Sequence, residues 1–210
     1  MDMHIICEAV IRGDAKEVEN QIKKAIELRA APDVILNEGL IKAMDVVGTR
    51  FEAGEFFVPE MLIAARAMKT GMALLRPLFK ESGIKPLGKV VIGTVKGDLH
   101  DIGKNLVGLM LEGAGFEVID MGTDVSADKF VETVKAEKPQ IIGLSALLTT
   151  TMFGARDVIE KLKAENVRDK VKVIVGGAPV TQAFADQIEA DGYADDAVSG
   201  SKKCKVLLNI

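Results

Sequence analysis

The sequence predicts an α/β protein with a helical bundle in its N-terminal part and a parallel sheet in its C-terminal part. Residues 1–82 show only helical patterns, whereas residues 89–210 alternate short apolar runs with amphipathic stretches. Of the 210 residues, 48% are hydrophobic and 28% are charged. This composition supplies enough apolar material for a packed core and argues against a disordered chain.

Four helices are expected in the N-terminal part. A short one lies near residues 3–12, and Asp14 followed by Glu17 is typical of the N-cap that starts the next. Pro32 and Pro59 suit the first turns of two more, because proline fits the start of a helix. The apolar residues after each of these starts have helical spacing, which predicts that the four helices pack as a small bundle.

Strands and helices alternate in the C-terminal part. This alternation indicates a parallel sheet covered on both faces, with the flavodoxin-like strand order 2-1-3-4-5. The strands are expected at 89–94, 117–121, 140–145, 171–175 and 192–194, and the helices at 104–113, 127–137, 152–165, 181–189 and 196–208. A polar segment with Gly and Pro separates the two parts. The expected division is a bundle domain over 1–82, a linker over 83–88 and a sheet domain over 89–210.

Composition excludes several classes of function. The net charge of -4 argues against binding to nucleic-acid backbones, and an aromatic content of 4% without tryptophan argues against binding single strands by base stacking. The two cysteines, Cys7 and Cys204, lie near opposite ends of the sequence, and the two histidines are His4 and His100. A cysteine-rich zinc site and a metal site with several histidines are therefore excluded.

The N-terminal residues do not resemble a secretion signal. Residues 1–11 contain Asp2 and Glu8 and lack a basic region followed by an apolar one. The longest uncharged run, residues 139–155, is rich in threonine and glycine, so it indicates a strand and a loop rather than a membrane span. We expect a cytoplasmic protein with no membrane or nucleic-acid partner.

Three loops are expected to meet at the carboxyl edge of the sheet, where open α/β sheets bind ligands. They follow the first, third and fourth strands and span residues 95–103, 145–151 and 176–181. The first loop holds His100 between two carboxylates. In an extended loop, residues i and i+2 can point the same way, so Asp98 could accept a hydrogen bond from Nδ1 of His100 and leave Nε2 for a metal.

His100 has several interpretations. It could be a histidine with structural hydrogen bonds only, a general base in a cleft, or the single protein ligand of a metal that a macrocycle such as haem or a corrin already holds. The run from Gly97 to Asn105 also approaches a phosphate-binding P-loop. Its spacing is one residue too long, however, and Asn105 replaces the required Ser or Thr.

Three ordered motifs carry a resemblance to a known family. They are Asp98-x-His100-x-x-Gly103, Ser145-x-Leu147 and Gly176-Gly177. Together they resemble the cobalamin-binding signature shared by methionine synthase, coenzyme-B12 mutases and the corrinoid proteins of methyltransferase systems. The longer run 97–105 resembles the methyltransferase branch closely, and residues 47–51 with 56–60 resemble the helical cap of that branch.

The resemblance implies a bound cobalamin or related corrinoid in the base-off, His-on form, with His100 as the lower axial ligand of cobalt. Asp98 would hold His100, and Thr151 would extend this contact where methionine synthase has a serine. The implied cofactor-binding residues are Gly97, Asp98, Leu99, His100, Asp101, Gly103, Ser145, Leu147, Thr149, Thr151, Gly176, Gly177 and Ala197.

Two further sets of positions follow from the same resemblance. Residues along the displaced nucleotide tail are matched by Ser145, Thr149, Gly176, Gly177 and Ala197. Cap residues over the upper face of the corrin are matched by Phe51 and Val58. Each set also has an ordinary interpretation, because Phe51 and Val58 could belong to the core of the bundle and the glycine pair to a turn between strand and helix.

The implied function is that of a corrinoid protein that carries a methyl group on cobalt. It would receive the group from a substrate methyltransferase and deliver it through an acceptor methyltransferase, for example to tetrahydrofolate or a thiol, with a reductive activase as a further partner. No catalytic residue is expected in the chain itself. One alternative is a small subunit of an adenosylcobalamin mutase, to which such a cap is foreign. Another is a B12-dependent sensor or regulator, which needs a DNA-binding module that the sequence does not show.

Overall fold

The computed structural model describes residues 2–82 and 85–210, and the chain forms two compact units. One unit comprises Met1–Lys85 with Glu112–Gly115, and the other comprises Pro86–Leu111 with Phe116–Ile210. The expected linker at 83–88 falls partly on residues 83 and 84, which lie outside the described residues, so the expected domain limits stay a prediction. Within the described ranges, no helix is both long and apolar enough to cross a membrane.

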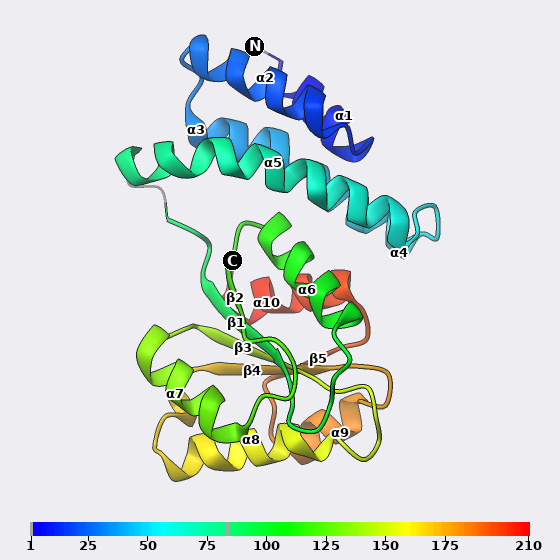
Figure 1. The fold of residues 1–210 in the computed structure, drawn as a ribbon, viewed down its shortest axis with the longest axis vertical. Helices are drawn as coiled ribbons and strands as arrows, with labels where there is room; N and C mark the ends of the chain where they lie inside the picture. The colour runs from blue at the N-terminus through cyan, green and yellow to red at the C-terminus, as the bar shows by residue number, and fades with distance from the viewer. Residues whose placement is uncertain (1, 83–84) are drawn as a thin grey trace. The chain divides into compact units, whose positions relative to one another are not determined.

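The first unit is helical, as the sequence predicts (Figure 1). The Asp14 carboxylate caps its helix as expected, because it accepts a hydrogen bond from the N–H of Glu17 at 3.0 Å. The helix expected from Pro32 continues to Glu52 but contains a π-helical stretch that the apolar periodicity does not reveal. The elements are α1 (His4–Ile11), α2 (Ala15–Glu27), α3 (Pro32–Val34), η1 (Ile35–Ile41), α4 (Lys42–Glu52) and α5 (Val58–Ser82).

Apolar stripes of these helices form the core of the first unit. Val18 and Ile22 of α2 and Leu40 of η1 are fully buried, and burying one such side chain contributes about 1.5–3 kcal/mol. A Cβ at Gly71 of α5 would lie 2.7 Å from Cδ1 of Ile22 and 3.0 Å from Cδ2 of Leu40. A glycine is therefore needed at this position for α5 to pack closely against its neighbours.

The second unit is a five-stranded parallel sheet in the order β2-β1-β3-β4-β5, which confirms the predicted topology. The strands are β1 (Lys89–Thr94), β2 (Glu117–Asp120), β3 (Ile141–Ser145), β4 (Lys172–Gly176) and β5 (Gly192–Ala194). The helices are α6 (Ile102–Gly113), α7 (Ala127–Glu137), α8 (Phe153–Ala164), the 3₁₀ turn η2 (Arg168–Lys170), α9 (Gln182–Gln187) and α10 (Ala197–Leu207).

Helices cover both faces of this sheet (Figure 1). On one face, Phe130 of α7 and Ile159 of α8 belong to the same core cluster as Val91 of β1. On the other face, α6 passes β1 at Gly108, where a Cβ would lie 2.9 Å from Cδ1 of Ile92. Val91 and Ile92 point to opposite faces because side chains alternate along a strand. β1 is thus buried on both sides, as expected of a central strand in a parallel sheet, whereas no residue of the edge strand β2 is fully buried.

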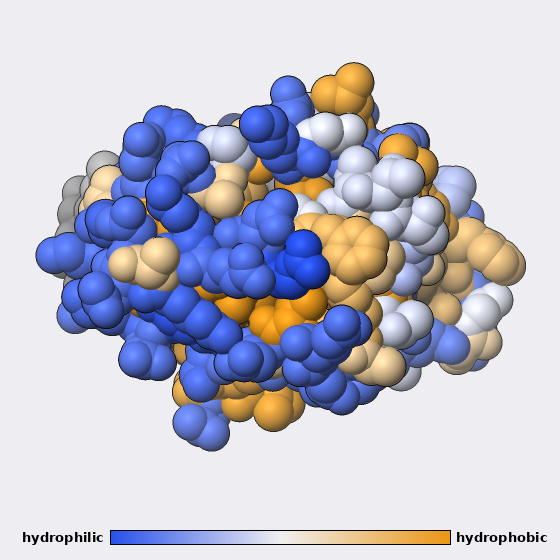
Figure 2. Space-filling view, turned by 90° about the horizontal axis from the view of Figure 1, so that it is seen from below, coloured by the Kyte–Doolittle hydropathy of each residue, from blue (hydrophilic) through white to orange (hydrophobic). Residues whose placement is uncertain are grey.

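The outer surface of α7, α8 and α9 is mostly hydrophilic. Figure 2, which views the molecule from below, shows many hydrophilic residues on this side with hydrophobic residues visible between them. Ion pairs link neighbouring helices here: Lys161 lies 2.8 Å from Asp128, and Lys135 lies 2.8 Å from Glu165. Exposed pairs of this kind contribute no more than about 1 kcal/mol each, so the stability of these helices comes mainly from their buried faces.

Each unit contains one buried cysteine. Cys7 in α1 is 5% exposed, and Cys204 in α10 is 1% exposed. Burial raises the pKa of both thiols, that of Cys204 to about 12. Both cysteines are free thiols, so neither contributes a cross-link.

The strand ends that matter for the site lie side by side. Thr94 of β1 pairs in register with Ser145 of β3, and Ser145 pairs with Gly176 of β4. The loops that follow these three strands therefore leave the sheet at the same edge, where a ligand of an open α/β sheet binds.

Candidate functional site

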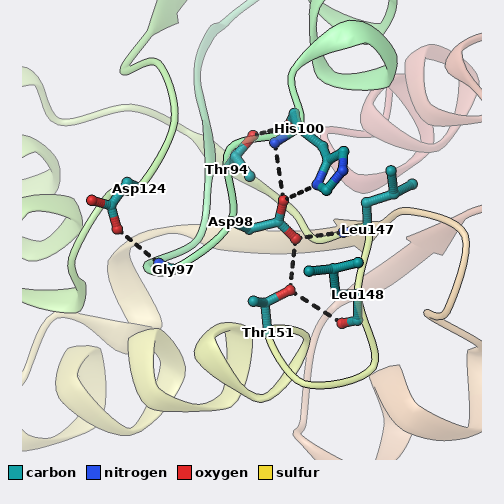
Figure 3. A network of polar contacts seen from close by, with 8 residues as sticks. All are labelled: Thr94, Gly97, Asp98, His100, Asp124, Leu147, Leu148 and Thr151. Atoms are coloured by element: carbon teal, nitrogen blue, oxygen red, sulfur yellow. Dashed lines mark hydrogen bonds and ion pairs between the residues drawn. The ribbon is translucent and has the colours of Figure 1, made fainter.

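A buried carboxylate, that of Asp98, organises the loop between β1 and α6 (Figure 3). Its Oδ1 accepts a hydrogen bond from the backbone N–H of His100 at 3.0 Å and lies 2.7 Å from Nδ1 of the His100 ring. Its Oδ2 accepts hydrogen bonds from the N–H of Leu147 at 2.8 Å and from the hydroxyl of Thr151 at 2.6 Å. The loop after β1 is thereby tied to the loop after β3, and the predicted contact of Asp98 with His100 is confirmed.

These contacts keep Asp98 ionised. Burial by itself would raise its pKa. The hydrogen bonds from Thr151, from the N–H groups of His100 and Leu147 and from the His100 ring outweigh burial and hold the pKa of Asp98 well below its usual range. An ionised carboxylate only accepts hydrogen bonds, so Nδ1 of His100 carries the hydrogen. In the neutral ring, the lone pair is then on Nε2.

The same arrangement leaves Nε2 of His100 unused. The side chain of His100 is 49% exposed, and none of the residues that the structure describes forms a hydrogen bond with Nε2. The backbone of His100 is also held, because the buried hydroxyl of Thr94 donates to its carbonyl at 2.8 Å. The ring is therefore fixed through Nδ1 while Nε2 can serve as a ligand.

Thr151 supplies the hydroxyl that the resemblance implies. Its Oγ1 lies 2.6 Å from Oδ2 of Asp98 and 3.1 Å from the carbonyl oxygen of Leu148. A threonine hydroxyl has one hydrogen to donate, and the ionised carboxylate at the shorter distance is the stronger acceptor. Thr151 thus completes a chain of contacts from the loop after β3 through Asp98 to the His100 ring.

Asp124 holds the same loop from the side of β2, and the sequence does not reveal it. Its carboxylate accepts a hydrogen bond from the N–H of Gly97 at 2.7 Å, and its own N–H donates to the carbonyl of Asp98 at 3.0 Å. Thr94 is a second residue absent from the predicted site. A polar residue at the end of an apolar strand could have indicated Thr94, whereas Asp124 lies 27 residues from Gly97 and has no local signal.

A buried lysine anchors the start of α6. Lys104 is 4% exposed, and its Nζ lies 2.6 Å from Oδ1 of Asp120 and 2.7 Å from Oδ1 of Asn105. Asn105 in turn donates to Oδ2 of Asp101 at 3.1 Å. Because the ammonium group is engaged within the unit, its geometry differs from that of a P-loop lysine, which reaches a phosphate.

Large apolar side chains are exposed around the end of β1 and the loop after β3. Such groups are unusual on a solvated surface when they cluster, and they are typical of a binding site for a ligand or partner. They are Leu99 (73% exposed), Ile102 (77%), Leu147 (43%), Leu148 (43%) and Phe153 (44%).

The glycines of the predicted site have different surroundings. A Cβ at Gly176 would lie 2.9 Å from the carbonyl oxygen of Ala194. Gly177 has φ +119°, and a Cβ there would lie only 1.9 Å from the carbonyl oxygen of Ala146. Backbone packing requires a glycine at both positions, and the role of the pair beside a nucleotide tail stays a prediction. At Gly103, in contrast, no described atom beyond its chain neighbours and the backbone of its own helix lies within 4 Å of where a Cβ would be.

The remaining implied residues lie near this edge or at its ends. Ser145 ends β3 and is partly buried, Thr149 is exposed in the next loop, and Ala197 begins α10 and is buried. Leu99 and Asp101 flank His100 and are exposed. Their contacts with a nucleotide tail or a corrin ring stay predictions.

The two implied cap residues belong to the first unit. Phe51 lies in the last turn of α4 and is partly buried, and Val58 begins α5 and is 37% exposed. Phe57, which directly precedes Val58, is 64% exposed. The alternative role in the bundle core therefore suits Phe51 better than Val58, and the role over a corrin stays a prediction for both.

Comparisons with known proteins match both parts of the chain. Two family models, each described as "B12 binding domain", match residues 88–203 and 4–76. A dimethylamine corrinoid protein of Methanosarcina barkeri is 52% identical over 205 residues, which cover 97% of this chain and 95% of that protein.

Two solved structures share the fold along nearly the whole chain. A cobalamin-binding protein from Desulfitobacterium hafniense DCB-2 has a TM-score of 0.82 and 33% identity, and the match covers 99% of this chain and 98% of that one. The methanol:cobalamin methyltransferase complex MtaBC from Methanosarcina barkeri has a TM-score of 0.87 and 31% identity, with 99% and 79% covered. The motifs, the fold and these matches agree, and the chain belongs to the B12-binding corrinoid proteins.

Proposed function

We propose that this corrinoid protein carries a methyl group from a substrate-specific methyltransferase to a second methyltransferase, which delivers it to an acceptor such as tetrahydrofolate or a thiol. The observation that carries the proposal is the His100 ring, which Asp98 holds through Nδ1 while Nε2 has no partner among the described residues. The names of its relatives support it, since one is a dimethylamine corrinoid protein and another forms a methanol:cobalamin methyltransferase complex. A cytoplasmic location and a reductive activase as a further partner belong to the same proposal.

The residues at the carboxyl edge fit a corrinoid. Among the described residues, no group of three or more His, Cys, Asp or Glu side chains lies together as a metal site. One imidazole suits a metal that arrives in its own macrocycle. Leu99 and Ile102 offer exposed apolar surface for such a flat ring, and the open space at Gly103 leaves room for it.

Each residue of the chain Thr151–Asp98–His100 has a separate task in this proposal. When bound, the corrinoid's cobalt supplies the chemistry that accepts and releases the methyl group. His100 would ligate cobalt through Nε2 in place of the corrinoid's own base, in the base-off, His-on form. Asp98 selects the tautomer and fixes the orientation of the ring. Thr151 holds Asp98 from the opposite side.

The nucleotide tail and the cap complete the proposal. Ser145 and Gly176, which are in register at the ends of β3 and β4, would hold the tail together with Ala197. Gly177 and Thr149 lie in the loops that follow these strands. The bundle over residues 1–82 would serve as a cap, with Phe51 and Val58 as the residues that would shield a bound corrin from water.

The axial ligand is tested by electron paramagnetic resonance of cob(II)alamin bound to ¹⁵N-labelled protein. An axial ¹⁵N nucleus splits each cobalt line into a doublet, whereas the ¹⁴N of the corrinoid's own base gives a triplet. We expect a doublet for the natural sequence and for His4→Ala, which removes the other histidine. His100→Ala is expected to lose the doublet. A triplet in the natural sequence, or a doublet that survives His100→Ala, would refute this ligand.

Methyl transfer is tested separately with a purified dimethylamine methyltransferase. The chain, loaded with reduced cobalamin, is expected to be methylated from dimethylamine only when that methyltransferase is present, and His100→Ala is expected to slow the reaction more than His4→Ala. The same assay is run with methanol and a methanol methyltransferase, to compare methanol with dimethylamine as the methyl donor. Methylation that proceeds equally without any methyltransferase would contradict a carrier that depends on separate enzymes.

A further inference from the structure

One acidic residue outside the predicted motifs restrains the loop that carries Asp98. Asp124 follows β2 and lies before α7. It accepts a hydrogen bond from the N–H of Gly97 through its carboxylate, as Figure 3 shows, and it donates its own N–H to the carbonyl of Asp98. A single residue therefore holds two consecutive residues of the loop, one by accepting and one by donating.

The backbone around Asp124 is unusual. Asp124 has φ +54° and Gly97 has φ +81°, so both contact partners lie in the left-handed region. Asp and Asn adopt this region more readily than other residues with a side chain. Next to them, Val95 and Val125 form a parallel bridge, and the N–H of Val125 donates to the carbonyl of Thr94 at 3.0 Å. The segment after β2 thus extends the pairing of β1 up to the His100 loop.

The contact between Asp98 and His100 depends on where the backbone places Asp98. Leu147 and Thr151 hold the carboxylate of Asp98 from the loop after β3, and Asp124 holds its carbonyl from the loop after β2. Hydrogen bonds weaken steeply when their geometry deviates, and the ring contact is a single one of 2.7 Å. Movement of the backbone at Gly97 and Asp98 would therefore turn the His100 ring.

Asp124 is exposed, so a large contribution of its carboxylate to folding is not expected. We propose that Asp124 is a positioning residue for His100, which holds the N–H of Gly97 and the carbonyl of Asp98 so that Asp98 keeps the ring in one orientation. The proposal rests on the proposed role of His100 as the cobalt ligand. The restraint itself belongs to the protein alone and can be measured without a corrinoid.

Three variants separate the side chain of Asp124 from its backbone. Asp124→Gly removes the carboxylate and keeps the left-handed conformation accessible. Asp124→Asn keeps an acceptor oxygen and the tolerance of this conformation, so it should restore the natural behaviour. Lys138→Gly is the matched control, because Lys138 has φ +48° in the same unit and its N–H bonds to Val134 within the helix end of α7.

The first measurement uses the full chain without cofactor, by nuclear magnetic resonance with hydrogen exchange. In Asp124→Gly, we expect the amide hydrogen of Gly97 to exchange about fivefold faster and the Nδ1–H signal of His100 to broaden or disappear. Asp124→Asn and Lys138→Gly are expected to match the natural sequence. If the Gly97 amide exchanges faster while the His100 ring signals stay unchanged, Asp124 restrains the loop only locally and the proposal is wrong.

The second measurement is the affinity for cob(II)alamin. We expect it to fall about tenfold in Asp124→Gly and to stay within about twofold in Asp124→Asn. Failure of the two proposals can be told apart. If the natural sequence lacks the ¹⁵N doublet but the ring signals respond to Asp124→Gly, His100 is not the ligand and the positioning still holds. If the doublet is present and neither the ring signals nor the affinity responds, the positioning is refuted.

Discussion

The carboxyl and amino ends of the parallel strands each have a carboxylate with a lowered pKa. The two carboxylates differ in whether the group that they bind keeps a polar atom without a partner. At the carboxyl edge, Asp98 binds an imidazole whose Nε2 has no partner in the described chain. At the amino edge, Asp191 accepts from the N–H of Val173 at 2.8 Å and pairs with Arg168 at 2.8 Å and Lys172 at 3.1 Å. Burial would raise the pKa of Asp191, but these contacts outweigh burial and lower it.

The groups that contact Asp191 are all engaged by groups of the protein itself. Arg168 also donates to the carbonyls of Val171 at 3.1 Å and Glu189 at 2.7 Å, so its guanidinium serves the backbone as well. A solvent-open hollow of about 530 Å³ lies at this edge, yet its lining is mostly charged side chains that already pair with one another. Neither a lowered pKa nor a hollow is therefore enough to indicate a site. The unused Nε2 of His100 is what distinguishes the carboxyl edge.

Replacing each carboxylate by an amide should give the largest difference between the two ends of the strands, in corrinoid affinity and in stability. Asp98→Asn is expected to lower the affinity for cob(II)alamin about 10- to 100-fold, because the N–H of Leu147 loses an acceptor and the His100 ring loses a charged one. Asp191→Asn is expected to leave this affinity within about twofold and to lower the free energy of unfolding by about 2 kcal/mol, since it leaves Arg168 without its carboxylate.

Affinity titrations and urea unfolding of both variants provide the check. The comparison fails if Asp191→Asn weakens corrinoid binding as much as Asp98→Asn does.

A smaller effect is expected from the hydroxyl behind Asp98. Thr151→Val keeps the shape of the side chain but removes its hydrogen bond to Oδ2, and we expect about a tenfold loss of affinity for cob(II)alamin. Thr151→Ser keeps the hydroxyl and should stay within about threefold of the natural sequence. Equal affinities of the two variants would show that the hydroxyl does not act through Asp98.

The smallest effect concerns pH. The folded pKa of Asp191 is lowered, so its contribution to stability is fully present above its unfolded value of about 3.9 and is lost as the pH falls through the folded value. The difference in unfolding free energy between the natural sequence and Asp191→Asn should therefore be constant near pH 7 and shrink below about pH 4. Urea unfolding at a series of pH values measures it, with Asp186→Asn as an exposed control. A difference that grows on acidification would contradict this sign.

Local chemistry made much of the fold and part of the site predictable. Asp14 caps its helix through a contact three residues away, and the central strands β1, β3 and β4 are short, mainly apolar runs. The contact of Asp98 with His100 spans two residues, so it too follows from the spacing in an extended loop. The hydroxyl of Thr151 was expected from the family resemblance, and its bond to Asp98 at 2.6 Å is present.

What the sequence did not reveal depends on distant parts of the chain. Asp124 reaches Gly97, and Asp120 reaches Lys104, only because β1 and β2 pair in one particular register. Gly177 is another example, because the carbonyl of Ala146 in a different loop leaves no room for a side chain at this position. Secondary-structure propensity and hydrophobic periodicity describe residues that are close in the sequence, and they carry no information about contacts between distant segments.

The buried thiols give each unit a natural probe of how often its helices open. A thiol reagent attacks the thiolate, and burial keeps Cys7 in α1 and Cys204 in α10 both protonated and shielded. Labelling of either thiol must therefore wait until the surrounding helices open, so its rate reports how often that opening occurs. With one thiol in each unit, mass spectrometry of the labelled peptides can time the opening of the two units separately, in the natural sequence and without an added probe.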